Sequence, residues 1–113
     1  MSEDLFLKII AGEIPSTKVY EDEYVYAFRD INPVAPTHVL IVPRKHIRDV
    51  DDLTPEDAEL MGRILLAAQK IAAQEGLTNG YRIVVNTGPN AQQSVFHIHF
   101  HLIGGRQMSW PPG

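Results

Sequence analysis

The sequence predicts an α+β fold with an antiparallel sheet. Short apolar strand patterns bounded by turn residues occur in both halves of the chain, and one long amphipathic helix separates them. The length of 113 residues fits a single domain spanning residues 1–113. So small a domain buries only about two-thirds of its unfolded surface, and pairing with a second copy would add stability.

The first half of the chain predicts one short helix and three strands. The helix begins at Ser2–Asp4, whose side chains can cap it, and ends near Gly12. Its apolar residues Leu5, Phe6, Ile9 and Ile10 recur at helical spacing. Strands are expected at 18–21, 24–28 and 38–42, the last a run of apolar residues typical of a strand covered on both faces.

The second half begins with the long helix. Thr54 is the expected N-cap, Pro55 fits the first turn and Asp57 completes a capping box. The helix presents one apolar stripe and ends at Gly76; the stripe comprises Met61, Ile64, Leu65, Ala68, Ile71 and Ala72. Strands are expected at 81–85 and 95–103, joined by a loop of neutral hydrogen-bonding residues at 86–94.

Composition excludes several classes of function. The formal charge of −4 argues against sequence-independent binding of nucleic acid, which needs a basic surface. There is no cysteine, so disulfides, thiol chemistry and cysteine-based zinc motifs are absent. The N-terminus lacks the basic and apolar regions of a signal peptide, and no apolar stretch approaches the roughly 20 residues of a membrane span. We therefore expect a cytoplasmic protein without membrane contact.

Three of the five histidines alternate in His97-Ile98-His99-Phe100-His101. Successive side chains of a strand point to opposite faces, so the three imidazoles should line one face and the apolar residues the other. Three histidines would fill a core poorly, because every buried ring nitrogen needs a hydrogen-bond partner. The pattern therefore indicates chemistry at this strand.

Two interpretations of the histidine row compete. His-x-His spacing can hold zinc, but the backbones of His97 and His101 are about 13 Å apart on a straight strand, and further ligands would have to come from His38, His46 or a carboxylate. A nucleophile uses the spacing better. His99 lies in the centre, its neighbours are about 6.6 Å away, and the loop before it offers donors for phosphate oxygens. We therefore expect no metal and no other cofactor.

The motif resembles that of the histidine triad (HIT) family, and within it the Hint branch of nucleotide-binding phosphoramidases. The segments 30–38 and 104–113 also resemble that branch, so the likeness covers nearly the whole chain. It implies a five-stranded HIT-like fold with one long and one short helix. It also implies a homodimer in which the sheet continues across the interface, with the long helices packed there.

The resemblance assigns roles to individual residues. His99 is the nucleophile that attacks the α-phosphorus of a purine nucleotide and forms a nucleotidyl-histidine, which water hydrolyses. His97 and His38 correspond to a hydrogen-bonded relay behind it, and His101 to a histidine near the phosphate and leaving group. Asp30 corresponds to the acid that binds the ribose hydroxyls. The purine slot would be lined by Leu5, Phe6, Ile9, Phe28 and Ile31.

The phosphate loop and the tail complete the implied site. Asn86 and Ser94 match phosphate contacts, and Trp110 would reach the active site of the partner subunit. Gln92 is a departure, since many Hint proteins have glycine two residues before the serine, and it can narrow the loop. The predicted activity is cleavage of AMP-like P–N bonds. The alternatives are a nucleotide-binding regulatory or scaffold protein, and a dinucleotide hydrolase or nucleotidyltransferase.

Overall fold

A computed structural model describes the backbone of residues 2–113 and the side chains of residues 5–113. Five strands form one antiparallel sheet in the order β1-β2-β3-β5-β4. The strands are β1 Lys18–Glu21, β2 Val25–Arg29, β3 Thr37–Pro43, β4 Tyr81–Val85 and β5 Phe100–Gly104. The helices are α1 Ser2–Ile10 and α2 Ala58–Gln74, with single 3₁₀ turns at Val50–Asp52, Pro55–Asp57 and Pro89–Ala91. The predicted α+β class and five-stranded sheet are confirmed.

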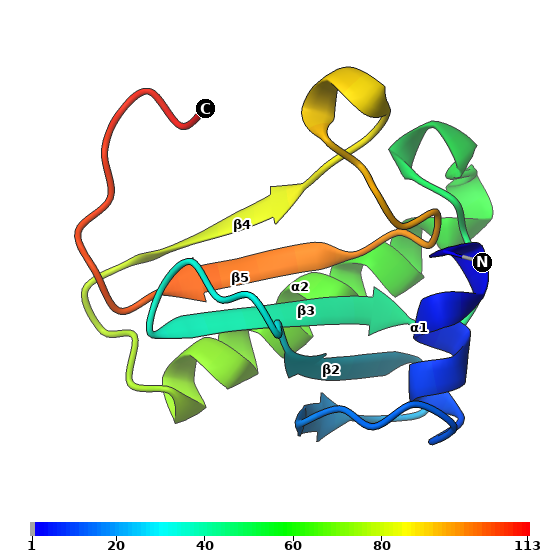
Figure 1. The fold of residues 1–113 in the computed structure, drawn as a ribbon, viewed down its shortest axis with the longest axis horizontal. Helices are drawn as coiled ribbons and strands as arrows, with labels where there is room; N and C mark the ends of the chain where they lie inside the picture. The colour runs from blue at the N-terminus through cyan, green and yellow to red at the C-terminus, as the bar shows by residue number, and fades with distance from the viewer. Residues whose placement is uncertain (1) are drawn as a thin grey trace.

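The two helices cover opposite faces of the sheet. Figure 1 shows α2 behind the sheet, whereas α1 lies at one end of β2 and β3. The face toward α2 carries the larger core, built on Val39, Ile41, Ile64, Ile71 and Leu102. The face toward α1 carries a smaller one: Phe6, Ile9, Tyr26, Phe28, Leu40 and Val42. The apolar residues of the strands therefore pack into two separate clusters, one on each face of the sheet.

The expected capping box is present, but it lies one turn before α2. The amide of Thr54 donates to the Asp57 carboxylate over 3.0 Å at the 3₁₀ turn Pro55–Asp57, and α2 follows from Ala58 with Asp57 as its N-cap. At the other end Gly76 has φ +73°, a backbone conformation that favours glycine. Capping of α1 by Ser2–Asp4 lies outside the described side chains.

The expected stripe of α2 was wrong at Leu65. Its side chain is 49% exposed, as is that of Leu66 at 58%. The buried residues are Ile64, Ala67, Ala68, Ile71 and Ala72. At about 100° per residue, Leu65 lies roughly a quarter turn from the centre of this stripe, so it faces away from the sheet.

The expected fifth strand was too long, because β5 begins only at Phe100. Its neighbours pair with residues 100–104, and Pro43 at the end of β3 has no amide hydrogen to extend the ladder. His97 and His99 therefore precede the strand. Side chains nevertheless alternate between the two faces over the whole motif, as expected, since Ile98, Phe100 and Leu102 all belong to the core under α2.

No helix in the part of the chain that the structure describes is long and apolar enough to cross a membrane.

Candidate active site

The three histidines of the motif gather on the face of the sheet that carries α1. The ring centroids of His99 and His101 are 5.1 Å apart, and Phe6 of α1 packs edge-on against both His99 and His97 at 5.0 and 6.0 Å. The His97 side chain is fully buried, and His99 is 7% exposed. A short apolar helix therefore presses the imidazoles against the sheet and limits their rotation.

A single hydrogen bond determines which nitrogen of His99 is free. Nδ1 lies 2.8 Å from the backbone carbonyl oxygen of His97. A carbonyl oxygen only accepts, so Nδ1 must carry the proton. In the neutral ring Nε2 then has the lone pair, which is the form that a nucleophilic histidine needs.

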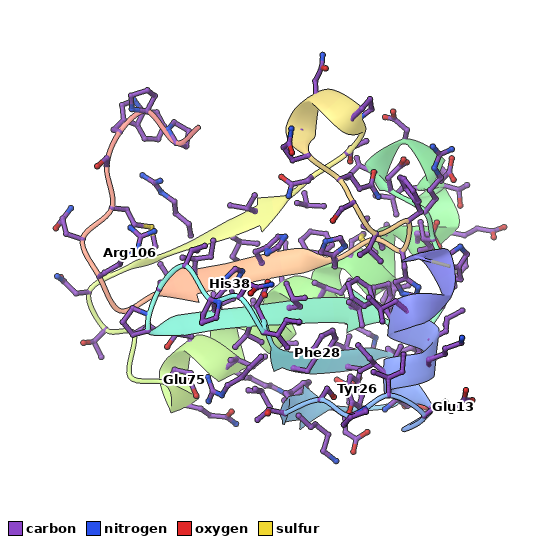
Figure 2. The ribbon with its side chains drawn as sticks, viewed as in Figure 1. Glu13, Tyr26, Phe28, His38, Glu75 and Arg106 are labelled. Carbon is purple, nitrogen blue, oxygen red and sulfur yellow. The ribbon has the colours of Figure 1, made fainter. Side chains whose placement is uncertain are left out.

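His101 belongs to a second hydrogen-bonded group. Its Nδ1 is 2.9 Å from Nε2 of His38, and that same nitrogen of His38 is 3.3 Å from the Asp30 carboxylate. The amide of Val34 donates to Nδ1 of His38 over 3.1 Å, so the proton of neutral His38 is on Nε2. His101 accepts this proton at Nδ1, which leaves its own N–H on Nε2. Figure 2 shows His38 at the start of β3, on the same side of the sheet as Phe28.

The structure thus arranges the predicted relay differently from the sequence interpretation. His38 was expected beside His97, behind the nucleophile. It contacts His101 and Asp30 instead, and the contact of His97 with Nδ1 of His99 is made by its backbone carbonyl rather than its ring. The ring of His97 donates from Nε2 to the carbonyl of Pro43 over 2.8 Å, and its Nδ1 lies 3.1 Å from Nδ1 of His46.

Burial keeps all three motif histidines neutral. Desolvation lowers the pKa of His97 and of His99, although hydrogen bonds to the carbonyls of Pro43 and His97 respectively raise them in part. The pKa of His101 falls to about 4, first through burial and then through the neighbouring rings of His99 and His38. Neutral rings at pH 7 retain the lone pair on His99 and the single N–H on His101.

The loop before the motif is held by a residue that sequence reasoning missed. Buried Gln93 accepts from the amide of Gly88 and donates to the carbonyls of Arg48 and Val95. Its neighbour Gln92 has φ 67°, the left-handed conformation that favours glycine. The backbone at this position therefore suits the glycine that the resemblance implies there better than it suits glutamine.

The remaining predicted ligands lie around the imidazoles at different depths. Asn86 is half-buried and Ser94 is exposed, both in the loop that leads to the motif. Of the expected slot, Phe6, Ile9 and Phe28 are buried in the small core, Leu5 is half-buried at its margin and Ile31 is 90% exposed. The side chain of Trp110 is 81% exposed, on the tail that leaves the sheet beside β4 (Figure 1).

Asp30, His38 and His101 bring three possible metal-ligating atoms within 4.8 Å of one another. The two imidazole nitrogens are 2.9 Å apart, whereas nitrogens on one tetrahedral zinc lie roughly 3.3 Å apart. A metal on Nε2 of His38 would also move that ring's proton to Nδ1, against the N–H of Val34. These residues fit a hydrogen-bonded group and not a metal centre.

The fold and the site define a class: a small α+β protein with an antiparallel sheet, in which a neutral histidine is oriented by a backbone carbonyl and packs against a second imidazole ring. The chain belongs to the HIT family, whose domain model matches residues 11–108.

Among its relatives, a 14 kDa zinc-binding protein from Zea mays is 55% identical over 99% of this chain and 89% of its own. An adenylylsulfatase from Arabidopsis thaliana is 52% identical over 99% and 78%. Among solved structures, a HIT family hydrolase from Legionella pneumophila superimposes with a TM-score of 0.94 at 55% identity, covering 96% of this chain and 98% of that one. A histidine triad nucleotide-binding protein from Candida albicans gives 0.81 at 35% identity, covering 96% and 83%.

Proposed function

We propose that this protein is a nucleotide hydrolase of the adenosine 5′-monophosphoramidase type, acting through a nucleotidyl intermediate on His99. The observation that supports this most directly is the bond from Nδ1 of His99 to the carbonyl of His97, which leaves the Nε2 lone pair free. Relatives named as hydrolases, as an adenylylsulfatase and as nucleotide-binding proteins support the same class of reaction.

The proposed first step forms a bond from Nε2 of His99 to the α-phosphorus and breaks the P–N bond. The imidazole becomes positively charged, and the His97 carbonyl, which accepts a hydrogen bond from Nδ1–H, stabilises that charge. The N–H on Nε2 of His101 donates a hydrogen bond to a phosphate oxygen, and the leaving nitrogen takes a proton from solvent and departs as the free amine. Water then attacks the phosphorus and breaks its bond to Nε2 of His99. This step releases AMP, gives one proton back to solvent and returns His99 to its neutral form.

The substrate is a purine nucleotide in this proposal. Asp30 accepts from the ribose hydroxyls, while Asn86, Ser94 and the Gln92 backbone contact the phosphate. The half-buried Leu5 and exposed Ile31 contact the purine above the buried Phe6, Ile9 and Phe28. The formal charge of −4 makes these local donors necessary for binding an anion.

The test compares AMP release from adenosine 5′-monophosphoramidate by the native protein and by His99→Gly. We expect kcat to fall about a thousandfold or more, because the nucleophile is removed. Added imidazole should restore part of the activity, while it should not restore a His101→Ala variant. A His99→Gly protein that retains full activity would refute the proposal, whereas retained cellular function in a His99→Gly strain that no longer releases AMP would favour a binding or scaffold function. A panel with adenylyl sulfate and a dinucleoside polyphosphate would identify the preferred leaving group.

The catalytic unit in this proposal is a single HIT domain over residues 1–113 that works as a homodimer. β4 is an edge strand of the sheet and exposes Tyr81 and Ile83, and α2 exposes Leu65 and Leu66. An edge strand and an apolar helix face of this kind favour a sheet continued into a second copy. Trp110 then extends from the tail toward the partner's site.

Sedimentation velocity tests the proposed dimer. We expect the native protein to sediment as a dimer and Leu66→Lys to shift it toward the monomer. Val50→Lys, at an exposed apolar residue outside α2 and β4, serves as the matched control for the added charge. A monomeric native protein at micromolar concentration would contradict this part of the proposal.

A further inference from the structure

His46 has no part in the mechanism proposed above, yet it touches the residue behind the nucleophile. It lies three residues after β3 and is exposed, whereas its partner His97 has no exposed surface. The ring centroids are 5.1 Å apart at an interplanar angle of 62°. An exposed imidazole in edge contact with a buried one connects solvent with the interior of the site.

The proton positions of His97 follow from its two partners. Nε2 faces the carbonyl of Pro43 at 2.8 Å, so that nitrogen must donate. The buried ring is neutral, because desolvation lowers its pKa. Its Nδ1 must therefore accept, and the group facing it at 3.1 Å is Nδ1 of His46. The His46 proton is thereby assigned to Nδ1.

His97 also supplies the carbonyl that accepts from Nδ1 of His99. Ring and carbonyl belong to the same residue, so a rotation of the ring that breaks the Pro43 bond disturbs the backbone that orients the nucleophile. An unpartnered Nδ1 in a buried ring would favour such a rotation or a change of tautomer. The N–H of His46 gives Nδ1 of His97 a hydrogen-bond partner, so neither the rotation nor the change of tautomer is favoured.

The backbone near His46 is anchored independently of its ring. The amide of Ile98 donates to the carbonyl of Ile47 over 2.6 Å, and Ile47 itself is buried in the main core. Gln93 bonds the carbonyl of Arg48. Replacing the His46 ring should therefore leave the segment in place, which separates the effect of its N–H from a general loss of structure.

We infer that His46 is a positioning residue: its Nδ1–H holds His97 in one tautomer and orientation, and through the His97 carbonyl it keeps the lone pair of His99 on Nε2. The consequence for turnover rests on the proposed function, whereas the consequence for the proton positions does not. His46 acts through His97 and touches no substrate.

The variants that test this are His46→Asn and His46→Leu, which have nearly the same shape. The side-chain N–H₂ of asparagine is attached to Cγ, as Nδ1 is in histidine, so it can donate to His97; leucine cannot. We expect kcat for AMP release to fall about tenfold or more in His46→Leu with KM within about twofold, and to stay within about threefold of native in His46→Asn. Equal kcat values in the two variants would overturn the inference for turnover.

Histidine ¹⁵N–¹H correlation spectra give a readout that needs no substrate. The native protein should show His97 protonated on Nε2 and both His46 and His99 protonated on Nδ1. In His46→Leu the His99 signals should move toward mixed tautomers, while His46→Asn should retain the native pattern. A native His97 protonated on Nδ1, or an unchanged His99 tautomer in His46→Leu, would overturn the inference. Native tautomers as expected in a protein without turnover would refute the proposed function alone.

Discussion

Replacing His101 with asparagine should reduce the loss of stability in acid. His101 is half-buried against His99 and His38, and its pKa in the folded protein is about 4. Asparagine keeps an acceptor at the position of Nδ1, so Nε2 of His38 can still donate to it over the distance now seen, 2.9 Å. Asparagine does not titrate. The substitution therefore removes the proton-binding site and retains the hydrogen bond.

The magnitude follows from proton linkage. In the unfolded chain a histidine has a pKa of about 6.5, so between about pH 6.5 and pH 4 the unfolded state binds more protons at His101 than the folded state does. Stability falls as the pH drops through this window, and His101 contributes nothing above it. The difference of roughly 2.5 between the two pKa values corresponds to about 3.4 kcal/mol at most. Because the ring is partly exposed and water screens it, we expect about 2 kcal/mol.

The assay is urea unfolding at pH 7.5 and pH 4.5. The native protein should lose about 2 kcal/mol more than His101→Asn between the two pH values, because the other histidines and the carboxylates titrate in both proteins. Equal losses would refute the reasoning that burial of His101 couples its protonation to unfolding. A larger loss in the variant would show that the sign of the linkage is wrong.

Three further predictions concern the loop, the N-terminal helix and metals. Gln92→Gly relieves the φ of 67° and should raise the free energy of unfolding by about 1 kcal/mol in a urea titration; a decrease would contradict the strain. Phe6→Ala should cost about 3 kcal/mol and also lower kcat, since the ring is 3% exposed and packs on His99; unchanged kcat would limit its role to stability. Protein purified without a nickel column should contain no stoichiometric zinc by elemental analysis, and EDTA should leave turnover unchanged.

The sequence predicted the layers of the fold well, because apolar alternation and capping residues act locally. Ile98, Phe100 and Leu102 face α2 as their spacing implies, and Thr54 with Asp57 caps the 3₁₀ turn that leads into the long helix. The end of a strand depends on its neighbours. β5 begins at Phe100 because the chains beside it stop pairing there, which no pattern within residues 95–99 indicates.

The sequence predicted which types of residue form the site, but not which of them are hydrogen-bonded to one another. The alternating motif pointed to His99, but nothing in its spacing shows that His38 bonds His101 rather than lying behind the nucleophile. His46 was expected only as a possible zinc ligand, and Gln93 was not expected in the site at all. Their partners His97 and Arg48 are 51 and 45 residues away in sequence. His46 had a weak signal as a lone histidine soon after the central strand, whereas Gln93 had none.

The hydrogen bonds that orient His97, His99 and His101 join neutral rings to backbone carbonyls or to other imidazoles. Bonds between neutral groups are not weakened by dissolved ions, so ionic strength should leave the orientation of the nucleophile unchanged. The approach of an anionic substrate is different, since the chain carries a net charge of −4 and repels it over long range. Added salt screens that repulsion, so substrate capture should become faster in salt while the chemical step keeps its rate.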